Sequence, residues 1–160
     1  HILETGNGMY LVDCGAFISD VPDPEAANKD LPFDPKELKA VLLTHAHADH
    51  NGRLPLLFKK GFRGPIYCTD ATRDMTEVML VQSARIQKEN DDDPAFDEKD
   101  AKGASGLLKV VPYNRKFEVD KMTVRYTDAG HILGSAMAEV WTDGRKILFS
   151  GDMGPDTAPI

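Results

Sequence analysis

The stretch THAHADHNG (residues 44–52) places three histidines and one aspartate within six positions, directly after the apolar run AVLL. Alternate side chains of an extended backbone point to the same side, so His45 and His47 can meet one ion. Asp49 and His50 follow where the chain turns. Neutral imidazole and carboxylate groups are good ligands for Zn²⁺, and also for iron or manganese. The alternative is a chance cluster of surface histidines, but desolvating so many titratable groups without a metal would be costly.

The composition is that of an ordinary globular protein, with 160 residues, 41% hydrophobic and 28% charged. This length suggests one domain or a part of one. The sequence has no apolar run near the ~18–20 residues of a membrane-spanning helix, and its start HILETGNG does not resemble a signal peptide. Cys14 and Cys68 are isolated, so we expect buried strand cysteines and a cytoplasmic location. The net charge of −7 argues against a broadly basic, nucleic-acid-coating surface, but leaves locally held nucleic acid open.

Apolar runs and turn residues predict an α/β domain. Strands are expected at ILET (2–5), MYLVDCG (9–15), KAVLLT (39–44) and PIYCT (65–69), and in the tail at KFEV (116–119), MTVRYTDAG (122–130), AMAEVWTDG (136–144) and RKILFSGD (145–152). The tail includes a hairpin turn at Thr142-Asp143-Gly144.

Three helices are expected between these strands. They are RLPLLFKKG (53–61), ending at Gly61; TRDMTEVMLVQSARIQKEN (72–90), stopped by DDDP (91–94); and FDEKDAKGASGLLKVV (96–111), capped by Asp97. The apolar side chains of the second helix that recur at helical spacing are Met75, Val78, Met79 and Ile86.

The pattern H-x-H-x-D-H resembles the signature of the metallo-β-lactamase fold superfamily. That resemblance requires further ligands downstream, each at the end of a strand. His131 in TDAGHILGSA and Asp152 in LFSGDMG stand in the expected order. THAHADHNGRLP, GPIYCTDATRDM, DAGHILGSA and FSGDMG together look like the β-CASP branch, which comprises RNA-cleaving and messenger 3′-end-processing hydrolases and predicted exonucleases.

The fold implied by the resemblance is the α/β, metallo-β-lactamase-type αββα sandwich. In β-CASP proteins a second domain is inserted after the aspartate that corresponds to Asp152, and the chain then returns to complete the first domain. Residues 1–160 would be the N-terminal portion of that domain, without the inserted domain and the C-terminal completion. Both ends also read as cuts through a larger protein.

The resemblance also implies roles for individual residues. The metal ligands would be His45, His47, Asp49, His50, His131 and Asp152. One Zn²⁺ would be held by His45, His47 and His131, and the second by Asp49 and His50, with Asp152 bridging. Asp49 and Asp152 would serve the reaction of a zinc-activated hydroxide with RNA, and Asp49 would also orient the attacking water. Asp13 in LVDCG would support the metal-binding loop from behind.

In the family, the histidine that protonates the leaving group and the last ligand of the second metal come from later in the chain. We therefore expect a nearly complete first metal site, a deficient second one, and little or no activity for this stretch alone. The whole protein would act on single-stranded RNA and have no membrane partner. A homodimer that covers exposed strand edges is also expected. Arg73, Arg85 and Lys88 can approach an RNA backbone, but solvated helix charge is the preferred interpretation.

Two alternatives stay open. A small-molecule hydrolase of the same fold, acting on a thioester, lactone or β-lactam, would share the metal loop, because one fold hosts many substrates. The stretches DAGHILGSA and GPIYCTDATRDM favour the nuclease. A non-catalytic scaffold of an RNA-processing complex would have little need of ligands at all six positions.

Overall fold

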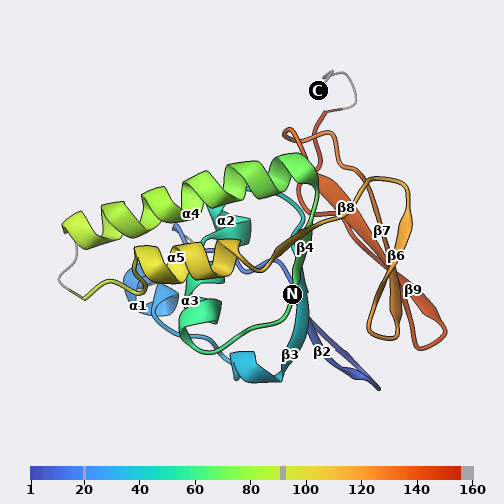
Figure 1. Cartoon of the computed structure of the whole chain (residues 1–160), viewed down its shortest axis with the longest axis horizontal. Coiled ribbons are helices and arrows are strands. Elements are labelled where there is room, and N and C mark those ends of the chain that lie inside the picture. Colours follow the sequence, from blue (N-terminus) through green and yellow to red (C-terminus); the bar gives the residue numbers. More distant parts are fainter. Residues whose placement is uncertain (20, 91–92, 156–160) are drawn as a thin grey trace.

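Two β-sheets lie face to face, and helices cover the outer face of one of them (Figure 1). The computed structural model describes residues 1–19, 21–90 and 93–155. The first sheet has the order β1 (Ile2–Thr5), β2 (Gly8–Val12), β3 (Leu38–Leu42), β4 (Ile66–Cys68) and β5 (Leu108–Val110). Its strands β2 to β5 run parallel, and β1 is antiparallel to β2. The second sheet is an antiparallel meander of β6 (Lys116–Val119), β7 (Met122–Asp128), β8 (Ala136–Thr142) and β9 (Arg145–Phe149).

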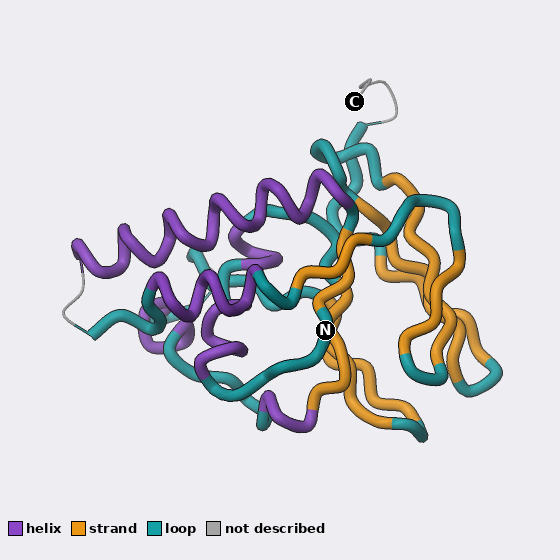
Figure 2. The backbone as a smooth tube through the Cα atoms, viewed as in Figure 1, coloured by secondary structure: helices purple, strands orange, loops and turns teal. Residues whose placement is uncertain are grey.

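The helices form one layer beside the parallel sheet, as Figure 2 shows in purple. They are α1 (Pro24–Asn28), the 3₁₀ helix η1 (Pro35–Glu37), α2 (Ala48–Asn51), α3 (Leu54–Lys59), α4 (Asp70–Asn90) and α5 (Glu98–Ser105). A parallel sheet needs such cover because its crossover connections place helices on its faces. The predicted α/β class is therefore confirmed.

Strand β3 shows how the sequence builds two apolar cores. Val41 and Leu43 belong to the core under the helices, whereas Ala40 and Leu42 belong to the core between the sheets. All four are at most 1% exposed. Successive strand residues point to opposite faces, so an uninterrupted apolar run is what a strand covered on both sides requires. The resulting order of helix layer, sheet and sheet supplies three layers of the expected αββα sandwich.

The outer face of the sheet β6 to β9 has no helix over it in the part of the chain that the structure describes (Figure 1). Leu148 on β9 is correspondingly 56% exposed. On the same face, Glu139 forms ion pairs with Arg125 and Lys146. The expected pairing with a second copy stays a prediction.

Several predicted ranges extend beyond the observed elements. The stretch 9–15, expected to be a strand that ends in a turn, is strand up to Val12 and leaves the strand at Asp13, which takes a left-handed conformation with φ 60°. The predicted helix 96–111 ends at Ser105, and its last residues form the edge strand β5. The N-terminal cap at Asp97 is confirmed, as part of a reciprocal capping box with Asp100.

Helix α4 was predicted correctly, but part of its buried face was not. Val78 is 71% exposed and Ile86 is 48% exposed. The fully buried positions are Thr72, Thr76, Leu80 and Ala84. The stripe keeps helical spacing, but its N-terminal half is made of threonines, whose hydroxyls meet polar partners. Of the predicted stop DDDP, residues 91 and 92 lie outside the described residues.

Three further local predictions concern the two cysteines, the hairpin turn and membrane-spanning helices. Cys14 and Cys68 are free and buried, and burial raises the pKa of each thiol to about 12. Asp143 and Gly144 both have positive φ, as the tight hairpin between β8 and β9 requires. No helix in the described ranges is long and apolar enough to cross a membrane.

Candidate metal centre

The candidate site lies where several strands end and their loops converge. His45 and His47 follow β3, and Asp49 and His50 lie on the single turn α2. His131 is in the loop between β7 and β8, and Asp152 follows β9. The structure thus brings together all six side chains that the sequence analysis selected as ligands.

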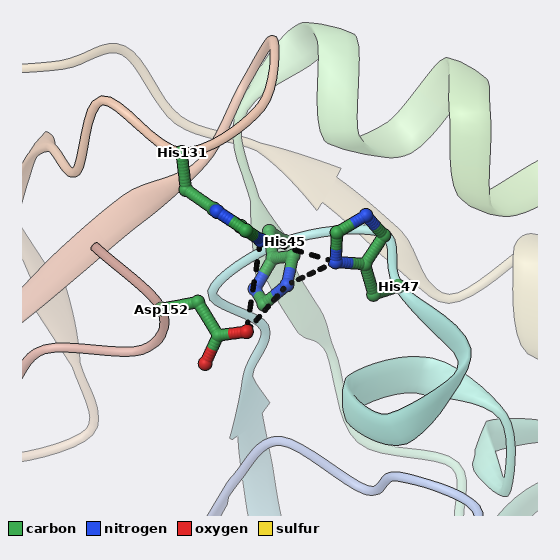
Figure 3. A group of neighbouring side chains, drawn as sticks. All are labelled: His45, His47, His131 and Asp152. Atoms are coloured by element: carbon green, nitrogen blue, oxygen red, sulfur yellow. Dashed lines mark hydrogen bonds and ion pairs between the residues drawn. The ribbon is translucent and has the colours of Figure 1, made fainter. Parts of the chain in front are cut away.

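One group consists of three imidazoles and one carboxylate (Figure 3). Nδ1 of His47 lies 3.1 Å from Nε2 of His45 and 3.2 Å from Nε2 of His131. Oδ2 of Asp152 lies 3.8 Å and 3.6 Å from the same Nε2 atoms of His45 and His131, respectively. Four ligands about 2.0–2.1 Å from a tetrahedral Zn²⁺ would be roughly 3.3 Å from one another, so this spacing fits such an ion.

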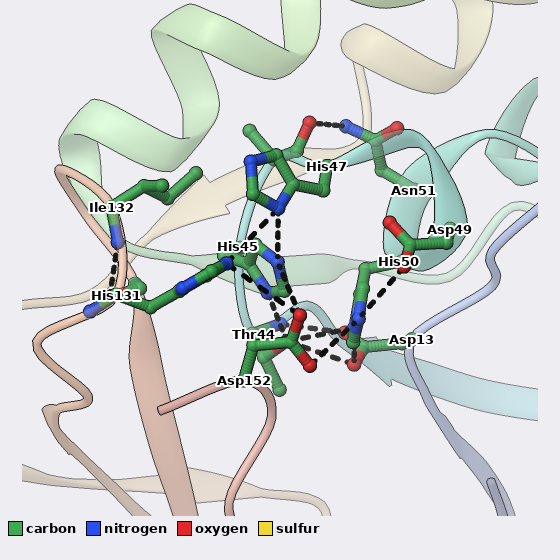
Figure 4. A network of polar contacts seen from close by, with 12 residues as sticks. Asp13, Thr44, His45, His47, Asp49, His50, Asn51, His131, Ile132 and Asp152 are labelled. Atoms are coloured by element: carbon green, nitrogen blue, oxygen red, sulfur yellow. Dashed lines mark hydrogen bonds and ion pairs between the residues drawn. The ribbon is translucent and has the colours of Figure 1, made fainter. Parts of the chain in front are cut away.

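A second group shares Asp152 with the first (Figure 4). Nε2 of His50 lies 3.3 Å from Oδ1 of Asp152 and 3.8 Å from Oδ2 of Asp49. The two oxygens of Asp152 therefore face different groups, as a bridging carboxylate would. The side chain of Asp49 is 52% exposed, against 1% for His45, so the second group is the more open of the two.

Asp13 and Thr44 fix the orientation of two of the imidazoles. Asp13 accepts hydrogen bonds from the Thr44 amide at 2.7 Å and the Thr44 hydroxyl at 2.9 Å, and its Oδ2 lies 2.8 Å from Nδ1 of His50. A carboxylate only accepts, so Nδ1 of His50 carries the proton. The Thr44 hydroxyl has donated its own proton and can accept one from Nδ1 of His45 at 3.1 Å. Both rings thus present the Nε2 lone pair to the cluster, as a metal ligand must.

The surroundings shift the pKa values of His45 and His50 in opposite directions. Burial, helped by the nearby His50, lowers the pKa of His45 to about 4, so this ring is neutral at pH 7. Burial also opposes charge on His50, but the hydrogen bond and negative charge of Asp13, with Asp152 and Asp49, outweigh it and raise its pKa. An incoming cation would therefore meet a neutral ligand at His45.

Backbone hydrogen bonds join the loops independently of any metal. The Ala136 amide donates to the Thr44 carbonyl at 2.9 Å, which links the start of β8 to the histidine loop. The Gly154 amide donates to the Ala129 carbonyl at 3.0 Å, which links the loop of Asp152 to that of His131. The second contact is so close that a Cβ on Gly154 would lie 1.5 Å from the Gly130 carbonyl oxygen.

The segment after β2 holds the turn α2 in the same way. The Cys14 amide donates to the His50 carbonyl at 2.7 Å, and the Arg53 amide donates to the Cys14 carbonyl at 2.9 Å. A Cβ on Gly15 would lie 1.5 Å from the Asp49 carbonyl oxygen. The backbone of residues 14 and 15 therefore fixes where Asp49 and His50 stand.

Several supporting residues had no role in the sequence analysis. Thr44 was given no supporting role, although a polar residue at the end of a buried apolar run is a signal for such a role. Asn51 donates from Nδ2 to the Ala46 carbonyl at 2.8 Å and so holds the backbone between His45 and His47.

Arg73 pairs with Asp70 and Asp74, each at 2.7 Å, in keeping with the preferred interpretation of solvated helix charge.

The donor set is suited to divalent metal binding. It combines at least one neutral imidazole, orientating hydrogen bonds and carboxylates that offset the charge of a cation. Two adjacent cations in such a site can bind and polarise the oxygens of a phosphate or carbonyl group. The geometry thus fits a hydrolase and leaves the substrate open.

Comparison with known proteins gives the family. Residues 1–159 match the model of the metallo-beta-lactamase superfamily. A ribonuclease of Thermus thermophilus is 40% identical over 156 residues, which are 96% of this chain and 34% of the relative. The transcription termination factor FttA of Methanothermobacter thermautotrophicus is 35% identical over 94% of this chain and 24% of the relative. The chain thus spans about a third or less of the length of these relatives.

The fold also matches solved structures. A metallo-beta-lactamase of Cronobacter sakazakii superposes with a TM-score of 0.62 at 17% identity, over 99% of this chain and 57% of the other. At that identity the likeness shows the fold alone. The sequence relatives are consistent with the RNA-processing β-CASP branch predicted from the motifs.

Proposed function

This chain belongs to the metallo-beta-lactamase superfamily, and on that premise we propose that the protein is a metal-dependent ribonuclease acting on single-stranded RNA. The observation that carries the proposal is the convergence of six ligand side chains from separate stretches of the sequence. The relatives named a ribonuclease and a transcription termination factor support RNA as the substrate. The solved β-lactamase shares only the fold, so a β-lactam substrate is not proposed.

The metal we propose is zinc, as a pair of ions that share Asp152. His45, His47 and His131 would hold the first ion, and Asp49 and His50 the second. When bound, such a pair lowers the pKa of water towards neutrality and stabilises the charge that develops on a phosphate. Asp13 and Thr44 would keep the rings of His50 and His45 turned towards such ions, so little reorganisation would be needed during the reaction.

Asp49 has a further role in the proposal. Its half-exposed carboxylate stands at the open side of the cluster, where it can accept a hydrogen bond from the attacking water and orient it towards the phosphorus. Asp152 would contribute one oxygen to each of the two groups. Asp49 and Asp152 are thus the carboxylates that serve the reaction as well as the metal.

The limited coverage of the relatives supports a partial domain. We place residues 1–160 as a part of a metallo-β-lactamase domain within a larger protein. The second group offers three ligands among the described residues, and His1, the remaining histidine of the five, belongs to neither group. The rest of the protein would supply the missing ligand and the proton donor to the leaving group.

The test is cleavage of end-labelled single-stranded RNA by the intact protein that contains this chain. Cleavage should require metal, stop with a chelator, and return when Zn²⁺ is added. His47→Ala should abolish cleavage and lower the zinc content, whereas His1→Ala, which removes the histidine outside the cluster, should leave both unchanged. Zinc-free protein, or cleavage that survives His47→Ala, would refute the proposal. Hydrolysis of a thioester, lactone or β-lactam panel without RNA cleavage would replace it with the small-molecule alternative.

A further inference from the structure

The stretch GPIYCTDATRDM (residues 64–75) carries none of the proposed ligands. It forms β4 and the first turns of α4. Within it, Thr69 and Thr72 are 3% and 0% exposed, an unusual degree of burial for hydroxyl side chains. We propose that these two threonines are positioning residues that fix the loop 130–135 and, through it, His131. The inference rests on the metal centre of the proposed function.

Both threonine hydroxyls converge on one backbone atom. The Gly134 carbonyl oxygen accepts a hydrogen bond from Oγ1 of Thr69 at 2.6 Å and another from Oγ1 of Thr72 at 2.9 Å. Oγ1 of Thr69 also lies 3.0 Å from Oγ1 of Thr72, but its contact with the carbonyl is the shorter of the two, and it accepts a hydrogen bond from the Thr72 amide at 3.4 Å. A carbonyl oxygen has two lone pairs, so these two bonds saturate it.

The loop 130–135 cannot shift while the threonine hydroxyls are bonded to the Gly134 carbonyl. Gly134 has φ +87°, and a Cβ there would lie 2.6 Å from the Thr72 amide nitrogen and 2.9 Å from Oγ1 of Thr69. Only glycine can take this conformation and this approach at low cost. The loop therefore rests directly on the first turn of α4.

A compact turn carries this constraint from Gly134 to His131. The threonine hydroxyls contact residue 134. The next residue, Ser135, accepts hydrogen bonds at Oγ from the amides of His131 at 3.1 Å and Ile132 at 3.3 Å. The Ser135 amide donates back to the Ile132 carbonyl at 2.9 Å. Tyr113 donates its hydroxyl proton to the Ser135 carbonyl at 2.7 Å. The backbone of His131 is thus fixed on both sides.

The ring of His131 depends on this backbone for its place. Its Nε2 lies 3.2 Å from Nδ1 of His47 and 3.6 Å from Oδ2 of Asp152, both of them atoms of the cluster. A displacement of the turn would carry the ring away from the first group of ligands. Thr69 and Thr72 would then influence metal affinity without touching the metal.

The test uses the intact protein, stripped of metal and titrated with Co²⁺, whose visible absorption reports the ligand geometry. The double variant Thr69→Val with Thr72→Val keeps the side-chain shape and removes both donors. Its dissociation constant should rise about 10–100-fold, the usual effect of losing a group that orients a ligand. Thr69→Ser with Thr72→Ser retains both hydroxyls and should restore binding and spectrum.

Thr142→Val is the matched control. Its Oγ1 is buried and has no hydrogen-bond partner among the described residues, so this variant makes the same chemical change without removing a bond. It should bind Co²⁺ as the unsubstituted protein does. If the valine double variant does not fold, the single variants, each of which leaves the Gly134 carbonyl one donor, provide the same comparison.

A double-mutant cycle separates positioning from general stability. In a His131→Ala background, the valine substitutions should cause no further loss of Co²⁺ affinity, because the residue that Thr69 and Thr72 position is gone. The positioning role alone would be overturned by either of two results. One is a full additional loss of Co²⁺ affinity in the His131→Ala background, and the other is unchanged Co²⁺ affinity of the valine variant that retains His131. Failure of the unsubstituted protein to bind Co²⁺ would refute the metal centre itself and this inference with it.

Discussion

Replacing Gly15 with alanine is expected to displace the turn that carries Asp49 and His50. A Cβ on residue 15 would lie 1.5 Å from the Asp49 carbonyl oxygen and 2.0 Å from its carbonyl carbon. The first separation must at least double to reach 3.0 Å, the shortest distance that real Cβ atoms tolerate. Because the opposing atoms are backbone, no side-chain rotation can relieve the clash.

The expected magnitude follows from the bonds on either side of the clash. The Cys14 amide donates to the His50 carbonyl at 2.7 Å, and the Ala16 amide donates to the Ala48 carbonyl at 2.8 Å. Losing each costs about 1 kcal/mol, and overpacking adds about 1–3 kcal/mol. A loss of about 3–5 kcal/mol should lower Tm by roughly 6–20 °C in a domain of this size. The backbone shift that relieves this clash would also move Asp49, and a misplacement of about 1 Å at a reacting group can reduce activity about 100-fold.

Thermal unfolding and metal content of Gly15→Ala, measured side by side with Gly6→Ala, provide the assay. Gly6 is a suitable control because the nearest atom to a Cβ there is Oδ1 of Asp143 at 3.8 Å. Gly6→Ala should melt and bind metal as the unsubstituted protein does. If Gly15→Ala also does so, residues 14 and 15 do not fix the turn and the argument from close approach is wrong.

Three further perturbations test other parts of the structure. Ion pairs with Arg125 and Lys146 lower the pKa of Glu139 to about 2, so their stabilisation is present above the unfolded-state pKa of about 4.3 and is lost as pH falls towards 2. Urea unfolding should therefore show Glu139→Gln less stable than the unsubstituted protein at pH 7, with a gap that narrows below about pH 4.3 and closes towards pH 2, and a pH-independent gap would contradict this. Gly154→Ala should lower metal affinity, checked by cobalt titration, because its Cβ would lie 1.5 Å from the Gly130 carbonyl oxygen; wild-type affinity would argue against the link between these loops. Removing metal with a chelator should abolish RNA cleavage but preserve the far-ultraviolet circular dichroism spectrum, because backbone hydrogen bonds join the ligand loops; a large loss of helix signal would mean that the metal holds the fold.

The ligand positions could be predicted because the signal for them is local and chemical. His45 and His47 alternate after an apolar strand, and His131 and Asp152 each follow a further strand in the order that the family resemblance requires. Strands that end at one edge of a sandwich bring such residues together. The cap at Asp97 was predictable for the same reason, since it depends only on the neighbouring residues.

What could not be predicted depends on contacts between distant elements. The three residues of β5 continue a helical pattern, and only pairing with β4 makes them a strand. Val78 and Ile86 have helical spacing, yet the packing of α4 turns them to solvent. Thr69 and Thr72 look like ordinary residues at a helix start until Gly134, more than 60 residues later in the sequence, is placed against them.

The spread of the ligands along the chain also bears on how the protein is made. His47 and His131 lie 84 positions apart, so a ribosome adding about 5–20 residues per second needs roughly 4–17 s to deliver the second after the first. No cation can be enclosed by the whole set during that interval. The complete ligand set can therefore form only late in synthesis, whereas the Asp13 and Thr44 contacts that orient His45 and His50 involve only residues made before His131.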